Sequence, residues 1–193
     1  TLGPAATIYL TGKGYASASG PGAGTSTDTI LNPGTVRAAS HGGAGSSQVA
    51  TAKTYGSIQA PVHLGSGGFY AGGGALKLRA GGIATLNGSI ISDGLSWIRK
   101  GNGAGGSVWI VAAEFAGSGT IQAQGGGTNA TGDLGGGGGR IALIATNGNS
   151  FGSLILRAFG GNGAGADGAG GTIYLQGTSP TSNRRTLTVN NNN

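Results

Sequence analysis

Short segments of alternating apolar and polar residues recur along this chain. The clearest pattern is a glycine pair and one variable residue, followed by an apolar, a variable and a second apolar residue. It occupies residues 73–78, 105–110, 138–143 and 170–175, so consecutive copies are 32, 33 and 32 residues apart. Because alternate side chains of a strand point to opposite faces, each copy predicts a β-strand with one apolar face. Weaker copies stand at residues 5–10 and 46–51.

A second apolar motif lies between successive copies of the first. It reads glycine, serine or threonine, an apolar residue, a variable residue and alanine. Close copies occupy residues 34–38, 56–60 and 119–123, and looser copies occupy residues 88–92, 155–158 and 185–189. A bulky residue before several copies marks a corner; these residues are Tyr55, Leu86, Phe115 and Phe151. Each repeat therefore predicts two short strands, a corner between them and a closing glycine-rich loop.

Repeats of this length predict a stacked architecture, because one such unit cannot bury its apolar face alone. We expect an all-β parallel β-helix, or β-solenoid, of about five to six coils with glycine-rich return loops. It forms one domain over residues 1–193, with irregular coils in 1–72 and regular repeats of about 32 residues in 73–193. An antiparallel β-sandwich also uses many short strands, but the repetition of whole units favours the solenoid.

Stacking of the repeats predicts two apolar columns inside the solenoid. The first column contains Val49, Leu76, Val108, Ile141 and Ile173. The second contains Ile58, Ile90, Ile121 and Leu156. Successive members lie on neighbouring coils, about 4.8 Å apart.

Glycine supplies 46 of the 193 residues and is concentrated in the predicted return loops. Two explanations are open. Residues 135–139 and similar runs can adopt polyproline-II geometry and stack closely on neighbouring loops, which glycine permits because it has no side chain. Alternatively, the glycines only make the loops flexible. Collagen is excluded because the glycines do not recur at every third residue.

The chain carries a formal net charge of +6, from 11 basic and 5 acidic residues, and these basic residues are scattered. A nucleic-acid-binding protein would cluster them, so we expect no nucleic-acid partner. No apolar run approaches 18 residues, so we expect no membrane span. There is no cysteine. A low charge content with abundant Gly, Ser, Thr and Asn favours an extracellular or cell-surface location.

The repeats resemble the glycine-rich β-solenoid regions of large secreted microbial surface and adhesin-like proteins. Residues 105–110, 117–121, 135–143, 170–175 and 186–190 carry the resemblance, which covers residues 73–193 well and the first 72 residues poorly. It implies surface display, adhesion or matrix structure. It implies no catalytic residues and identifies no ligand.

Candidate chemistry is sparse. Asp133 and Asp167 are about one repeat apart, which would place them in adjacent loops as a carboxylate pair for glycoside hydrolysis. We favour the alternative, in which each is a solvated loop acid that orders backbone N–H groups. His41 and His63 have no cysteine partners, and we expect both to be solvated. We therefore expect no enzyme activity, no cofactor and no metal site.

Outward-facing aromatic residues give the strongest indication of binding. The variable position of the first motif places Tyr9, Lys77, Trp109 and Tyr174 on one outer face, and Trp97 follows in an insertion nearby. Such a face can stack on sugar rings or bury against another subunit. We take these five residues as candidates for binding or assembly. Coverage by a loop of the same chain is the alternative.

Strand-like segments near both ends suggest that the coil ends have no cap. Our first hypothesis is therefore an extracellular structural protein, a building block of a filament, sheath or adhesin stalk. It would assemble with itself or with the rest of a larger surface protein, through coil ends or lateral faces. The second hypothesis is a cell-surface or phage adhesin module that binds a glycan, including an anionic one, or a receptor. Asn87 and Asn129 begin glycosylation sequons.

Overall fold

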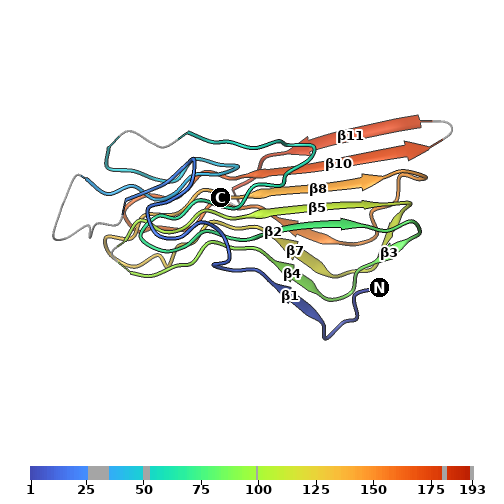
Figure 1. Cartoon of the computed structure of the whole chain (residues 1–193), viewed down its shortest axis with the longest axis horizontal. Helices are drawn as coiled ribbons and strands as arrows, with labels where there is room; N and C mark the ends of the chain where they lie inside the picture. Colours follow the sequence, from blue (N-terminus) through green and yellow to red (C-terminus); the bar gives the residue numbers. More distant parts are fainter. Residues whose placement is uncertain (26–34, 50–52, 99, 180–181, 192–193) are drawn as a thin grey trace.

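A computed structural model describes residues 1–25, 35–49, 53–98, 100–179 and 182–191 (Figure 1). Within these ranges the chain forms eleven strands and no helix. The strands are β1 (Thr7–Tyr9), β2 (Ala75–Arg79), β3 (Ala84–Thr85), β4 (Ser89–Ile91), β5 (Ser107–Ala112), β6 (Phe115–Ala116), β7 (Thr120–Gln122), β8 (Arg140–Ala145), β9 (Ile155–Arg157), β10 (Thr172–Ser179) and β11 (Ser182–Thr188).

The strands stack into a parallel β-solenoid, which confirms the predicted fold class. One sheet has the order β1-β4-β7-β9, and the second has the order β11-β10-β8-β5-β2. All pairs are parallel except β10 with β11. Complete coils run from β2 to β4, from β5 to β7 and from β8 to β9, with β1 and β10 adding half a coil at the ends. The stack is shorter than the predicted five to six coils because most of the described residues before β2 add no rung.

The two apolar columns form in the predicted register wherever the regular repeats supply them. In the first, Leu76, Val108, Ile141 and Ile173 pair in order, and Val108 and Ile141 are fully buried. In the second, Ile90, Ile121 and Leu156 pair in order. Each buried side chain of this size contributes about 1.5–3 kcal/mol to stability.

Two residues predicted to belong to the columns do not lie in them. Val49 remains 43% exposed, and Ile58 lies outside any strand. Ile8 takes the position expected for Ile58, because β1 pairs with β4 in the second sheet. The weak first-motif copy at residues 5–10 is therefore a second-sheet rung. A short pattern of alternation defines which side chains face inward, but does not define which sheet the strand joins.

The corners are also built from stacked residues. The rings of Phe115 and Phe151 lie 5.6 Å apart and nearly parallel, and Phe115 is 1% exposed. Leu86 is buried beside them in the same cluster. Tyr55, by contrast, belongs to a separate cluster with His41, described below, and marks no corner of the coil.

The glycine-rich loops pack into a hydrogen-bonded bundle. Residues 135–139 lie at its centre, and their backbone bonds reach loops on several sides. The donors and acceptors are Gly136 N to Gly126 O (2.8 Å), Gly137 N to Ala39 O (2.8 Å), Gly138 N to Ala169 O (3.0 Å), Gly105 N to Gly137 O (3.0 Å), Gly161 N to Gly136 O (2.8 Å) and Ser46 N to Gly135 O (2.9 Å). These hydrogen bonds satisfy buried backbone groups that loops without regular strands would otherwise leave unpaired.

Glycine is required at the centre of this bundle because of close approach. A Cβ atom added at any of residues 135–139 would lie between 1.8 and 2.1 Å from a backbone carbonyl oxygen. Collagen uses glycine at its axis for the same reason. Of the two explanations for the glycine content, close packing therefore holds for this bundle.

Part of the N-terminal region packs against the bundle and forms no coil. Ala39 N donates to Asn102 O (2.9 Å), and Val36, Ala38 and Leu134 form a small second core. At the opposite end of the chain, β11 turns back antiparallel to β10. The sequence suggested that residues 185–189 are a further copy of the second motif, and this prediction is wrong. Instead, β11 occupies the edge of β10 where another parallel strand would pair.

Candidate functional site

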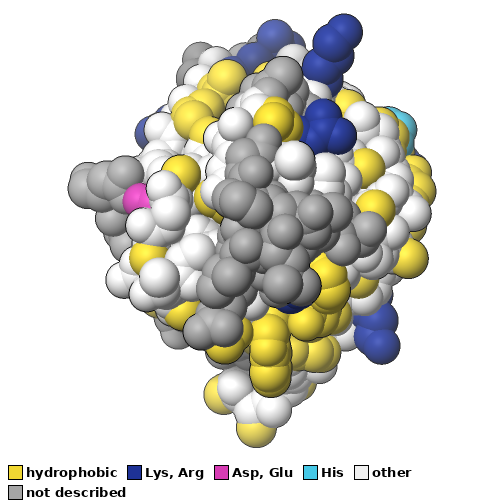
Figure 2. Space-filling view, turned by 90° about the vertical axis from the view of Figure 1, so that its left-hand side faces the viewer, with side chains coloured by type: hydrophobic (Ala, Val, Ile, Leu, Met, Phe, Trp, Pro, Cys, Tyr) yellow, Lys and Arg dark blue, Asp and Glu magenta, His cyan; other side chains and the backbone are white. Residues whose placement is uncertain are grey.

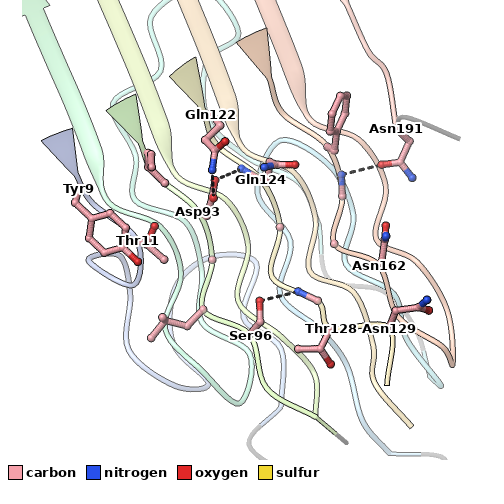
Figure 3. Close-up of a pocket in the computed structure, with 18 residues that line it drawn as sticks. Tyr9, Thr11, Asp93, Ser96, Gln122, Gln124, Thr128, Asn129, Asn162 and Asn191 are labelled. Carbon is pink, nitrogen blue, oxygen red and sulfur yellow. Dashed lines mark hydrogen bonds between the residues drawn. The ribbon is translucent and has the colours of Figure 1, made fainter. Parts of the chain in front are cut away.

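A groove of about 700 Å³ runs along the outer face of the sheet β1-β4-β7-β9, where the strands pass into the glycine-rich loops (Figure 3). It is an open groove, and its floor crosses several coils. The lining residues are Tyr9, Thr11, Ile91, Asp93, Gly94, Leu95, Ser96, Gln122, Gln124, Gly125, Gly127, Thr128, Asn129, Phe159, Gly160, Gly161, Asn162 and Asn191.

The repeat itself builds the floor of the groove. In each rung the residues of the apolar column face inward, so the alternate residues face outward. Strand pairing aligns Tyr9, Ile91 and Gln122 in one row. Two residues further along each rung, Thr11, Asp93, Gln124 and Phe159 form a second row, joined by the hydrogen bonds Gly12 N to Asp93 O (3.1 Å), Gly94 N to Gln124 O (2.9 Å) and Gly125 N to Phe159 O (2.9 Å).

Asp93 lies at the centre of the floor and is held by the neighbouring rung. Gln122 Nε2 donates to its Oδ2 (2.6 Å), and the backbone N–H of Gln124 donates to its Oδ1 (2.7 Å). Burial raises the pKa of Asp93, and these two hydrogen bonds oppose the rise. The carboxyl group is therefore fixed in position, and its remaining lone pairs can accept hydrogen bonds from a ligand.

The rim of the groove carries further polar groups (Figure 3). Ser96 Oγ accepts from Gly127 N (2.8 Å), and Asn191 Oδ1 accepts from Gly160 N (2.7 Å). Asn129 has a positive φ of 54°, a conformation that asparagine tolerates better than most residues. Asn162 is exposed at the same rim. Coils that are distant in sequence thus present amide and hydroxyl groups to one surface.

The chemistry of the groove suits a polyhydroxylated ligand. Asp93 is the only charged side chain among the lining residues that the structure describes. Amide groups of Gln and Asn both donate and accept hydrogen bonds, as sugar hydroxyls do. Tyr9 and Phe159 add aromatic faces on the first and last rungs of the floor, and aromatic rings stack on apolar ring faces.

Two of the five residues selected from the sequence lie at or beside this groove. Tyr9 lines it and is 61% exposed. Trp97 is 60% exposed and directly follows the lining residues Leu95 and Ser96. Its ring lies 6.5 Å from that of Tyr70.

The expected single aromatic face does not form. Tyr174 is only 5% exposed in β10, between β8 and β11, and its hydroxyl donates to Gln176 Oε1 (3.0 Å). Lys77 and Trp109 are neighbours on β2 and β5, and the Lys77 ammonium lies 4.4 Å above the Trp109 ring. Tyr9 is separated from them because β1 joins the other sheet.

Sequence reasoning missed most of the groove floor. Gln122 was recognisable as an outward residue of the second motif, but a strand-by-strand reading gave no reason to group it with Asp93. The usable signal is that polar residues occupy outward positions at the same register in successive repeats, at Asp93 and Gln124.

The loop carboxylates Asp133 and Asp167 hold their own loops. Asp133 is fully buried and accepts hydrogen bonds from Asn102 Nδ2 and from the hydroxyl of Thr128 (2.9 Å). Asp167 Oδ1 accepts from Gly163 N (2.9 Å). Neither residue lines the groove. Both carboxylates take the loop-ordering role favoured from the sequence, but only Asp167 is solvated, and the expectation of a solvated Asp133 is wrong.

His41 is fully buried, so the expectation of a solvated side chain is wrong. Its Nδ1–H donates to Gly105 O (2.7 Å), and its ring lies 4.6 Å from the ring of Tyr55. Arg140 Nε donates to Tyr55 O (2.9 Å), which ties this cluster to the solenoid. Burial lowers the pKa of His41 to about 4, against the opposing effect of the Gly105 hydrogen bond. Through these hydrogen bonds, His41 and Tyr55 hold the irregular N-terminal region against the coils.

On the face formed by the loop tips, the basic side chains that the structure describes do not gather into one patch. Figure 2 shows them mostly toward the edges of that face, with hydrophobic side chains gathered in its lower part. Within the described part of the chain, no helix is long and apolar enough to span a membrane. Comparison with protein-family models, curated proteins and solved structures found no match.

Proposed function

We propose that this chain is an extracellular, surface-displayed module that binds a glycan in the groove along β1, β4, β7 and β9. The groove carries the proposal, because it combines fixed hydrogen-bonding groups with aromatic faces on a rigid stack of coils. Sites built on regular elements hold their geometry better than sites on isolated loops. We favour recognition over catalysis, since Asp93 is the only carboxylate in the described lining of the groove.

The ends of the solenoid support recognition over polymerisation. The antiparallel strand β11 covers one edge of the larger sheet and carries Arg184 and Arg185. The opposite edge strand, β2, carries Lys77 and Arg79. Stacking of copies would bring these like charges together, and charged residues on edge strands commonly prevent such pairing. Sedimentation of the purified chain over a wide concentration range tests this, and concentration-dependent polymers would favour the filament hypothesis.

Binding to a microarray of polysaccharides tests the proposed function directly. We expect wild-type chain to bind at least one glycan and Asn162→Ala, at the rim of the groove, to weaken that binding by about tenfold or more. Asn183→Ala, an exposed change on β11, is the matched control and leaves binding unchanged. Equal binding by both variants, or no glycan bound by the wild type, would refute the proposal.

A further inference from the structure

The floor of the groove is a ladder of rungs, so a ligand that fills it crosses the strands. Tyr9 lies on the first rung, and Phe159 lies just beyond the strand of the last. Rungs are spaced by about 4.8 Å, so three intervals give a floor about 14 Å long. Polar side chains share one register on the two middle rungs, at Asp93 and Gln124, and Gln122 in the adjacent row donates a hydrogen bond to Asp93. The repeated arrangement fits a ligand that is itself a repeating chain.

Charge in the groove differs from charge on the whole protein. The chain has a net charge of +6, yet among the described residues that line the groove there is no Lys or Arg, and Asp93 is the one acid. Arg157 continues the row of Gln122 but does not line the groove. An anionic sugar on the floor would therefore approach a partly buried carboxyl group without a lining cation to offset it, which is unfavourable.

From these observations we propose that the groove binds a neutral, linear polysaccharide whose chain runs along the solenoid axis, with successive sugars on successive rungs. This rests on the proposed function and narrows it, because the sequence alone left anionic glycans open. The Asp93 carboxyl accepts hydrogen bonds from sugar hydroxyls, and the amides of Gln122, Gln124 and Asn162 exchange hydrogen bonds with the remaining hydroxyls. Tyr9 and Phe159 stack on rings at the two ends.

Affinity measurements with three soluble polymers test the charge selection: a neutral glucan or mannan, a polyuronate and an aminated glucan. We expect the neutral polymer to bind at least about tenfold more tightly than the polyuronate, with little dependence on salt. Asp93→Asn removes the groove charge and should shrink this ratio several-fold. Asn162→Asp adds a second charge at the exposed rim of the groove and should widen the ratio, which keeps the test valid if Asp93→Asn misfolds. Asp167→Asn makes the same charge change outside the groove and should leave the ratio unaltered.

Oligomers of the neutral polymer test the direction of the chain. We expect affinity to increase with each added sugar until the floor is filled, at about three or four sugars, and then to stop increasing. Tighter binding of the polyuronate or the aminated polymer, or an unchanged ratio in both charge variants, would overturn the inference while leaving glycan binding intact. A monosaccharide that binds as tightly as the oligomers would also overturn it. Failure of all glycans to bind would instead refute the proposed function.

Discussion

Replacing Gly137 by alanine would place a methyl group inside the glycine bundle. The added Cβ atom would lie 2.0 Å from the carbonyl oxygen of Gly43, whereas ordinary contacts begin at 3.4 Å. The loop that carries Gly43 would have to withdraw by more than an ångström. That movement strains or breaks the hydrogen bonds Gly137 N to Ala39 O (2.8 Å) and Gly43 N to Gly138 O (2.8 Å).

The cost of this substitution can be bounded. Overpacking a tight interior costs about 1–3 kcal/mol, and each buried backbone group left unsatisfied adds about 1–3 kcal/mol. We therefore expect Gly137→Ala to lower the free energy of unfolding by about 3–5 kcal/mol. For a chain of this size, that corresponds to a loss in Tm of about 10 °C.

Differential scanning calorimetry with a matched control checks this expectation. Gly81 is exposed, and a Cβ atom added there meets nothing within 4 Å. Gly81→Ala should leave Tm unchanged or raise it slightly, because alanine reduces the entropy of the unfolded chain. If Gly137→Ala melts at the same temperature as Gly81→Ala, close packing does not explain the glycine content of the loops, and loop flexibility would be the better explanation.

Three further outcomes are expected. Ile121→Ala removes a fully buried side chain of the second column and should lower the free energy of unfolding by about 2–5 kcal/mol, whereas Ile155→Ala, at a side chain 45% exposed, should lower it clearly less. Urea denaturation measures both losses, and equal losses would contradict the buried column. The pKa of His41 is about 4 in the folded state and near 6.5 in the unfolded chain, so the fold loses about 3 kcal/mol of stability as the pH falls from 6.5 to 4. His41→Asn, which can keep a donor toward Gly105, should show a smaller loss of Tm over that pH range. An identical loss would contradict this account. A glycan attached at Asn129 should block the groove, so production in a glycosylating host should abolish glycan binding and Thr131→Ala should restore it. A glycan at Asn87, outside the groove, should have no effect. Unimpaired binding by chain glycosylated at Asn129 would place the binding site elsewhere.

The regular repeats could be read from the sequence with their register. The spacing of the glycine pairs aligned Leu76, Val108, Ile141 and Ile173 correctly, and alternation placed Trp109 and Gln122 on the outside. These features are local, because an apolar residue at every second position must face the core in any stack of these units. The loops around residues 135–139 could be identified by composition, although composition left open whether they pack or move.

The site depended on contacts that no local pattern encodes. Tyr9 was expected beside Trp109 and Tyr174, but pairing of β1 with β4 places it beside Ile91 and over the groove. The same alternation is compatible with either sheet, so tertiary packing chose between them.

Sequence alone therefore determined the solenoid, its apolar columns and the rows of outward residues, because the repeat imposes them on every coil. Tertiary structure decided where the stack ends, since β11 turns back along β10 instead of forming another rung. It also decided that the glycine loops pack into a bundle and that Asp93, Gln122 and Gln124 meet on one floor. Those outcomes depend on which coils become neighbours, and long-range hydrogen bonds and close backbone contacts fix that choice.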